Sequence, residues 1–219
     1  KAVTYLERAA ERNHPRALDL LGLCCENGDG VEEDAVRAVA YYTRAAELGR
    51  AAAQCNLGYC YLVGIGCERS PERAVPWLER AAAQGYPRAM DLLGDCYRKG
   101  WGVETDGARA VDYYQQAAQQ GYLTGMVDLA QCYERGIGVA ADMGRAAQLC
   151  TEAAQRGSAS AMLWLGRWHR DHKPERDSRK KARYWLQQAA DQGSKQAQKE
   201  LKELGGSALQ KLAGLFRRS

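Results

Sequence analysis

The sequence is poor in several residue types on which many enzymes and membrane proteins depend. Its 219 residues include one Phe, three His, four Met and five Pro. No apolar run approaches the roughly 18–20 residues that a membrane-spanning helix needs, so we predict no membrane span. The net charge is only +4, and this weak balance indicates neither a nucleic acid nor an anionic membrane as partner.

The residues that carry chemistry are also sparse. The three histidines, His14, His169 and His172, are scattered, and no C-x-x-C motif occurs. His169 and His172 have the spacing to share one helix face, but a third metal ligand is missing. No Ser-His-Asp or Cys-His arrangement is recognisable. We therefore predict no enzyme activity, no metal and no cofactor.

What the sequence does contain is a strict repeat. An alanine pair recurs six times at intervals of 36 residues without an insertion, from Ala9-Ala10 to Ala189-Ala190. Self-similarity at a fixed period indicates an array of small units rather than one globular core. Because the chain starts at Lys1 rather than Met, we interpret it as a fragment or a processed form.

Each period contains a predicted helix, named helix B here, between an Asp or Ser and a Gly. An Asp or Ser side chain accepts a hydrogen bond from a free backbone N–H at a helix start. The predicted N-caps are Asp34, Ser70, Asp106, Asp142 and Ser178. Gly or Asn tolerates the left-handed conformation that ends a helix. The predicted ends are Asn13, Gly49, Gly85, Gly121, Gly157 and Gly193. Bulky residues such as Tyr41 and Trp77 complete an amphipathic pattern.

The next helix, named helix A, begins within about three residues of each end, which predicts an antiparallel hairpin. Its centre carries a Leu-Gly step at Leu21-Gly22, and the step recurs in the later periods, with Ala130 in place of Gly in the fourth. A Gly inside a helix costs roughly 1 kcal/mol relative to Ala. Its repetition predicts a close helix crossing at which large and small residues interdigitate.

A glycine loop follows helix A in four periods, for example as GIGC over residues 64–67 and GWGV over residues 100–103. A G-x-G can cradle phosphate, but no strand precedes these loops and no third Gly follows. We interpret them instead as turns whose glycines take positive φ.

These columns resemble the Sel-one-like repeat, a relative of the tetratricopeptide repeat. Residues 53–82 match its pattern with Ala53, Leu57-Gly58, Tyr61 and Ala81-Ala82, and residues 89–121 match it more fully. The resemblance implies an all-α fold, an α/α solenoid or superhelix of antiparallel helix pairs. We predict about five repeats in a domain of residues 1–205 and a short amphipathic capping segment at residues 206–219.

Two places depart from the pattern. Residues 172–175 (His-Lys-Pro-Glu) replace the glycine loop, so a different turn is expected because Pro174 fixes φ. The polar segment that opens at Ser194 suits a terminal cap with one solvated face. We read residues 207–218 as a capping helix; contact with a missing region or partner, or with a membrane surface, are the alternatives.

The eight cysteines follow the repeat. Cys24, Cys60, Cys96 and Cys132 share one column, and successive repeats place equivalent residues roughly 8–10 Å apart. A disulfide needs Cα atoms within about 7 Å, so we predict reduced cysteines that pack as small apolar residues. Reduced thiols favour a cytoplasmic location.

The resemblance also implies that helix A lines the inner, concave side of the array, where a partner binds. The resemblance gives outward positions of helix A in every repeat, for example Gln131 in the fourth and Ser160 in the fifth. Those of the second repeat are apolar, whereas those of its neighbours are polar, and apolar surface marks interaction sites. We predict a pocket for a peptide with one hydrophobic anchor and acidic neighbours. The proposed partner-binding residues are Leu23, Cys55, Tyr59, Leu62, Val63, Arg88, Asp91, Asp95, Arg98 and Lys99. The alternatives are that these side chains lie under an N-terminal extension or a neighbouring helix, or that the apolar residues are simple scatter.

The sequence therefore predicts a non-catalytic scaffold or adaptor that binds a protein or peptide. Two other readings stay open. One is a part of, or an accessory to, a cell-envelope enzyme, as reported for some members of the family. The other is a protein that self-associates through the open ends of the stack.

Overall fold

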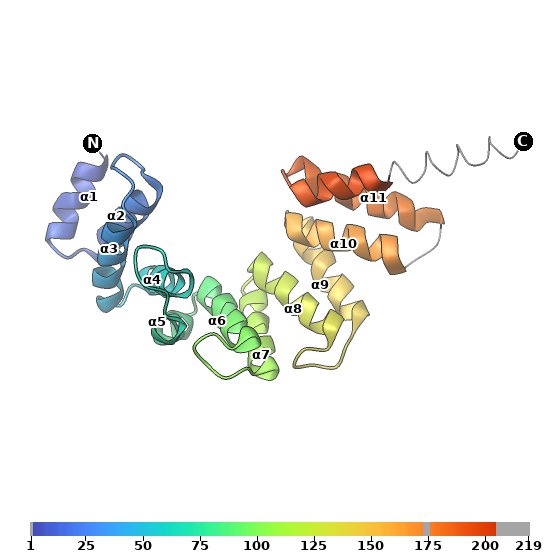
Figure 1. The fold of residues 1–219 in the computed structure, drawn as a ribbon, viewed down its shortest axis with the longest axis horizontal. Coiled ribbons are helices and arrows are strands. Elements are labelled where there is room, and N and C mark those ends of the chain that lie inside the picture. Colours follow the sequence, from blue (N-terminus) through green and yellow to red (C-terminus); the bar gives the residue numbers. More distant parts are fainter. Residues whose placement is uncertain (1, 173–175, 205–219) are drawn as a thin grey trace, which may run out of the picture. The chain divides into compact units, whose positions relative to one another are not determined.

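The computed structural model describes residues 2–172 and 176–204, and all regular elements of these residues are α-helices. Figure 1 shows the helices in chain order. Their bounds are α1 Ala2–Glu11, α2 Pro15–Asn27, α3 Ala35–Glu47, α4 Ala51–Val63, α5 Pro71–Ala83, α6 Pro87–Lys99, α7 Gly107–Gln119, α8 Leu123–Arg135, α9 Met143–Gln155, α10 Ala159–His172 and α11 Arg176–Asp191. A further helical stretch covers residues 195–204.

The chain divides into two compact units. The first comprises Lys1–Gly125 and Ile137–Val139, and the second comprises Met126–Gly136 and Ala140–Ser219. In the first unit α2 packs on α3, α4 on α5 and α6 on α7, while α1 also contacts α2, α3 contacts α4 and α5 contacts α6. In the second unit α10 packs against both α9 and α11. The predicted all-α solenoid of helix pairs is confirmed, with repeats one to five formed by α2/α3, α4/α5, α6/α7, α8/α9 and α10/α11.

The helix boundaries follow the predicted signals closely. Asp34, Asp106 and Asp142 each accept a hydrogen bond from the backbone N–H three residues later. Ser70 occupies the cap position of α5, but its side chain bonds Glu72 instead of the backbone. The prediction for Ser178 is wrong, because α11 already begins at Arg176 and Ser178 is buried within the helix.

Positive φ angles confirm the predicted turn residues. Asn13 and the glycine that ends each later helix B have φ between 56° and 94°. The second glycine of the loop after helix A has a further role. A side chain on Gly66 or Gly138 would collide with the carbonyl oxygen of Ala35 or Gly107, the first residue of the preceding helix B. The loops are therefore packed turns, and the neighbouring carbonyl oxygens make them unsuited to phosphate.

The Leu-Gly step is the point where the two helices of a repeat cross. A Cβ on Gly22 or Gly94 would lie 2.5 Å from the ring of Tyr42 or Tyr114, and a Cβ on Gly58 would lie 2.7 Å from Leu78. The predicted close crossing is confirmed. The large partner, however, lies one residue after the bulky column that the sequence singled out: Tyr42 and Tyr114 are fully buried, whereas Tyr41 and Tyr113 are only half-buried.

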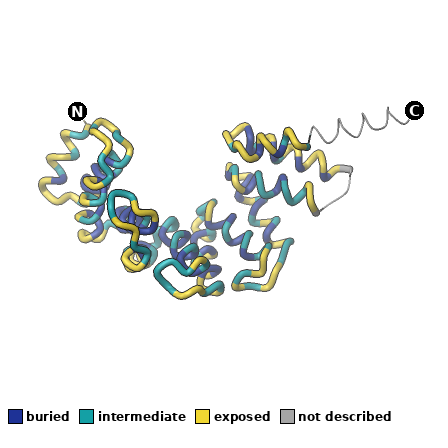
Figure 2. Tube along the Cα trace, viewed as in Figure 1, coloured by how far each residue is buried: buried dark blue, intermediate teal, exposed yellow. Residues whose placement is uncertain are grey.

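Burial follows the helix pairs, as Figure 2 shows, because the buried residues lie on the faces that the paired helices turn toward each other. The predicted core cysteines Cys60, Cys96, Cys132 and Cys150 are buried, while Cys24 is half-buried. The expected turn at residues 173–175 and the expected capping segment at residues 206–219 lie outside the described residues.

Candidate protein-interaction surface

The ten residues predicted to bind a partner lie on three helices A: Leu23 on α2, one group on α4 and one group on α6. Three of them are not on the surface. Cys55 is 0% exposed, Leu62 4% and Asp91 8%. Val63 is exposed, and Leu23, Tyr59 and Arg88 are half-buried. The expectation of an open apolar pocket that includes Cys55 and Leu62 is therefore wrong.

The reasons differ. Cys55 and Asp91 share a column with Asp19 and Val127, and this column of helix A is buried in all four repeats. Leu62 is buried because the core of repeat two has changed. In repeats one and three helix B places a tyrosine against the helix A glycine, and a buried phenol needs a hydrogen-bond partner. Tyr42 donates to Glu26, and Tyr114 donates to Asp95 over 2.8 Å. Repeat two has Leu78 at this position and no hydroxyl to satisfy. Leu62, in the column of Glu26, accordingly packs inside an apolar core.

Arg88 takes part in a polar chain that links the helices A of the first unit. The buried carboxylate of Asp19 on α2 accepts hydrogen bonds from Arg50 over 2.6 Å and from Asn56 over 3.2 Å. Asn56 in turn accepts one from Arg88 over 2.9 Å. The guanidinium of Arg88 lies 5.0 Å from the centre of the Tyr59 ring. The polar chain thus holds Arg88 over Tyr59 and partly covers that ring.

The predicted cations of α6 are also engaged within the protein. Arg98 and Lys99 both bind the carboxylate of Asp95, and Arg98 additionally donates to the hydroxyl of Tyr114 over 2.9 Å. Burial alone would raise the pKa of Asp95, but hydrogen bonds from Lys99, Tyr114 and Arg98 outweigh it and leave this pKa below its usual value. Asp95 therefore joins the buried hydroxyl of Tyr114 to the two cations Arg98 and Lys99 of α6.

The second unit contains a cavity of about 390 Å³ between α8 and α10, both of which are helices A. Most of its lining residues occupy the outward positions predicted for helix A in repeats four and five, such as Gln131 and Ser160. The lining consists of Val127, Gln131, Glu134, Arg135, Ser160, Leu163, Trp164, Arg167, Trp168 and Asp171. The cavity thus lies on helices A of repeats four and five, whereas the residues predicted to bind a partner lie on helices A of repeats one to three.

Two tryptophans form one wall of this cavity, and the sequence analysis did not single them out. The rings of Trp164 and Trp168 stack with centres 6.1 Å apart and planes 14° apart. Trp164 donates its indole N–H to Glu134 on α8 over 3.0 Å. The available signal was the i, i+4 spacing of the two tryptophans on one helix face.

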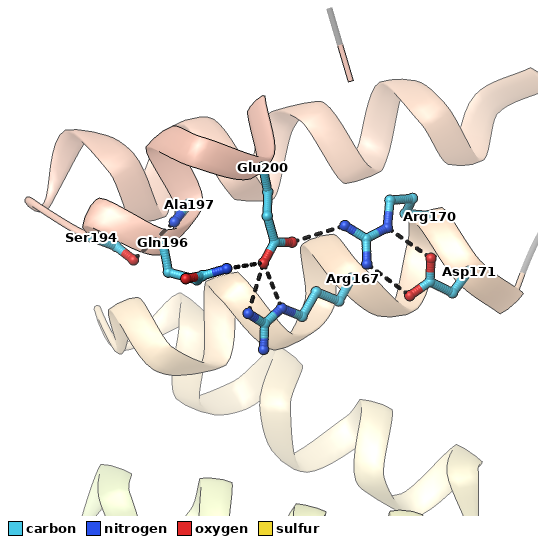
Figure 3. A network of polar contacts seen from close by, with 7 residues as sticks. All are labelled: Arg167, Arg170, Asp171, Ser194, Gln196, Ala197 and Glu200. Atoms are coloured by element: carbon cyan, nitrogen blue, oxygen red, sulfur yellow. Dashed lines mark hydrogen bonds and ion pairs between the residues drawn. The ribbon is translucent and has the colours of Figure 1, made fainter. Parts of the chain in front are cut away.

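Figure 3 shows a buried carboxylate, Glu200, that binds two arginines of α10, one of which, Arg167, lines the cavity. Glu200, from the helical stretch 195–204, accepts hydrogen bonds from Arg167 over 2.7 and 2.9 Å and from Arg170 over 2.9 Å. Arg170 also binds both oxygens of Asp171. Burial opposes ionisation of Glu200, but the hydrogen bonds of Arg167 and Gln196 and the charges of both arginines lower its pKa. These contacts attach the stretch 195–204 to α10.

The cysteines have the environment of structural residues. Burial raises the pKa of Cys55, Cys60, Cys96 and Cys150 to about 12, which keeps these thiols protonated at neutral pH. Among residues 2–172 and 176–204, no three His, Cys, Asp or Glu side chains are placed to hold a metal ion. No helix of the described chain is both long and apolar enough to cross a bilayer.

Comparison with known structures places these repeats among relatives. A Sel1 repeat protein from Oxalobacter formigenes is 35% identical, with a TM-score of 0.80 over 86% of this chain and 75% of that one. The protective antigen c5321 of uropathogenic Escherichia coli, which displays an SLR fold, is 32% identical with a TM-score of 0.75. That alignment covers 93% of this chain but 44% of the antigen. The immunity protein PA5088 of Pseudomonas aeruginosa, at 22% identity and a TM-score of 0.61 over 88% of this chain and 73% of its own, shares the fold.

The family profile gives the same result from the sequence side. The Sel1 repeat profile matches residues 1–14, 15–49, 51–86, 87–122, 124–158 and 159–194. No curated protein matched the chain in the corresponding search. Sel1 repeat proteins are generally protein-interaction scaffolds and typically lack catalytic activity. The profile covers nearly the whole described chain, and the chain therefore belongs to the Sel1 repeat family.

Proposed function

We propose that this chain is a non-catalytic scaffold that binds a peptide or protein partner through the exposed faces of its helices A. In the first unit the binding surface comprises Leu23, Tyr59, Val63, Arg88 and Lys99. Cys55, Leu62 and Asp91 support this surface from below. The second unit contributes the cavity between α8 and α10.

The observation that carries this proposal is the cavity of about 390 Å³ on the helix A faces of α8 and α10. Pockets of this size that combine apolar walls with a few polar groups are typical ligand sites. A buried side chain of a partner, above all an aromatic or apolar one, supplies most of the binding energy at such a site. The exposed Val63 offers a corresponding apolar contact in the first unit.

Two exposed valines of the first unit provide a matched test. Val63 ends α4, a helix A, and is 51% exposed; Val36 lies in α3, a helix B, and is 67% exposed. A photo-crosslinking amino acid at each position, used in extracts of the source cells, compares the two faces directly. We expect crosslinked protein from position 63 and little from position 36.

The same two positions then test the binding affinity, once the crosslinked partner protein has been purified. Val63→Asp should weaken its binding about tenfold, the equivalent of 1.4 kcal/mol, whereas Val36→Asp should leave the affinity unchanged. Equal effects of the two substitutions, or crosslinking only from position 36, would show that helix A is not the binding face.

Location in the cytoplasm stays a prediction, supported by eight free cysteines. Proteomic detection of the intact protein in fractionated cells tests it, and recovery from the cell envelope or the medium would contradict it.

A further inference from the structure

We infer that the cavity between α8 and α10 recognises a basic side chain, an arginine or lysine of the partner, on Trp164 and beside Glu134. This inference rests on the proposed function, since it names the chemistry that one binding surface takes. It starts from the charges that line the cavity.

Two of the lining charges are already neutralised. Arg167 and Asp171 belong to a group of four side chains in which Arg167 and Arg170 bind Glu200 and Arg170 binds Asp171. Two positive and two negative charges make this group neutral. A ligand anion that competes for Arg167 or Arg170 would leave the carboxylate of Glu200, which is only 6% exposed, without its partner, and this is costly.

Glu134 is different, because it forms no ion pair among the described residues. Its hydrogen bond joins the neutral indole N–H of Trp164, so the carboxylate keeps its negative charge at the half-buried cavity wall. An acceptor at the indole N–H also adds electron density to the ring. An electron-rich Trp face is the best aromatic partner for a cation.

The chain itself shows how its aromatic rings are used elsewhere. Arg88 lies over Tyr59 and Arg73 over Tyr61, with distances of 5.0 and 4.2 Å to the ring centres. Lys99 lies 4.2 Å from the centre of the Trp101 ring. Among the described residues no arginine or lysine covers Trp164 in this way. A basic side chain from a partner would complete the arrangement and gain Glu134 as its counter-charge.

Arg135 lines the same cavity and opposes a cation there. It is exposed to solvent, where screening weakens its effect, whereas Glu134 is half-buried. The two neighbours therefore make opposite predictions. Loss of the charge at Glu134 should weaken binding of a cationic ligand, and loss of the charge at Arg135 should strengthen it slightly.

The test uses a small probe, so that it needs no partner protein. N-acetyl-arginine amide is titrated into the full ¹⁵N-labelled chain, and the indole N–H signal of Trp164 is followed by NMR. N-acetyl-leucine amide and N-acetyl-glutamate amide serve as neutral and acidic controls. The Trp164→Phe variant assigns the signal.

We expect the arginine probe alone to shift this signal in a saturable manner. Glu134→Gln, which keeps an acceptor for the indole, should weaken the probe about tenfold, and Arg135→Gln should bind it at least as well as the parent chain. The unshifted indole signals of the other tryptophans confirm that each variant is folded.

Stronger binding of the leucine or glutamate probe would overturn the inference, as would an arginine affinity that is unchanged in Glu134→Gln. Either result leaves the proposed function standing, because crosslinking at Val63 does not depend on the charge of the ligand. Conversely, a failed crosslinking experiment leaves the response of Trp164 to the probes intact.

Discussion

Repeats two and three are built on the same backbone plan but fill their cores with different chemistry. Repeat three buries Tyr114 and satisfies its hydroxyl with Asp95 and Arg98. Repeat two buries Leu78, and Leu62 occupies the position of Arg98. An apolar stretch on one helix of a repeat protein can therefore reflect a change in its paired helix instead of a binding surface.

The same comparison explains why the arginines of helix A have different partners in repeats three and five. Where helix B carries leucine, as with Leu186 in repeat five, the arginines of helix A need not bind a tyrosine. Arg167 and Arg170 of that repeat bind Glu200 from the following helical stretch. The columns of Asp95 and Arg98 are thus used for the core in repeat three and for attachment of the next helix in repeat five.

The largest expected effect comes from placing the polar pair of repeat one into repeat two. Leu62→Glu should lower the free energy of unfolding by about 3–5 kcal/mol, because it buries an unpaired carboxylate. Adding Leu78→Tyr recreates the Tyr42–Glu26 pair and should recover about 1–2 kcal/mol of this loss. Urea unfolding followed by circular dichroism measures both. Val63→Glu, at the next and exposed residue, is the control. A double variant whose loss of unfolding free energy equals or exceeds the sum of the two single losses would contradict the comparison.

The cost of a Gly→Ala substitution at a helix crossing should depend on the residue that the glycine faces. Gly94→Ala forces a methyl group against the ring of Tyr114, which is held by its hydroxyl, and should cost about 2–3 kcal/mol. Gly58→Ala meets Cγ and Cδ2 of Leu78, a side chain that no hydrogen bond holds in place, and comes within 3.4 Å of the carbonyl oxygen of Ala74. It should cost about 1 kcal/mol, since Ala also favours the helix. The difference in urea midpoints gives the ranking, and a reversed order would show that ring rigidity does not limit the crossing.

Removal of the buried hydroxyl itself should have a moderate effect. Tyr114→Phe leaves the packing in place but removes the hydrogen bonds to Asp95 and Arg98, at a cost of about 1–1.5 kcal/mol. Tyr184→Phe, at a residue that is 56% exposed, is the matched control and should be neutral. Equal stability of the two variants would mean that the hydroxyl of Tyr114 does not stabilise repeat three.

Acid should remove the smallest share of stability, and it should act on repeat three and not on repeat two. Because the pKa of Asp95 is lowered on folding, its contribution is present above the unfolded pKa of about 3.8 and disappears as the pH falls through the folded value. Between pH 7 and pH 3 the free energy of unfolding of the Asp95→Asn variant should therefore fall by about 1 kcal/mol less than that of the parent chain.

Unfolding curves at several pH values test this, with the exposed Asp112→Asn as control. Glu200 follows the same sign, because its pKa is also lowered, so Glu200→Gln should flatten the acid side of the curve further. A parent chain whose stability does not change below pH 5 would exclude both contributions.

Much of the fold was predictable because its signals are local. The 36-residue period, the caps at Asp34, Asp106 and Asp142 and the left-handed Gly49 and Gly85 each act within one turn of the chain. The close crossing at Gly22 and Gly94 could also be predicted, since only a tight contact explains a repeated glycine inside a helix. The cap at Ser178 failed because α11 starts two residues earlier, at Arg176.

For the candidate binding surface, the sequence predicted only that helix A carries it and not which side chains are exposed. Positions on helix A such as Gln131 and Ser160 were recognised as outward, and the structure places both at a cavity. The burial of Leu62 could not be read from its own helix, because it depends on Leu78 at the crossing with α5. Cys55 lies in a column that is also buried at Asp19 and Asp91, so its position was wrongly taken as outward. The cavity wall formed by Trp164 and Trp168 was not predicted, because the repeat pattern in this helix is defined by Leu165-Gly166 and His169 and not by the two tryptophans.

The sequence by itself determined the helix pairs, their order and the glycine column of helix A that forms each crossing, because these depend on residues within one period. The tertiary structure decided which side chains stay open to a partner. Burial at one position depends on the size and hydrogen-bonding needs of a residue on another helix, and ion pairs such as Arg167–Glu200 join residues 33 positions apart. Such contacts exist only once the helices have packed.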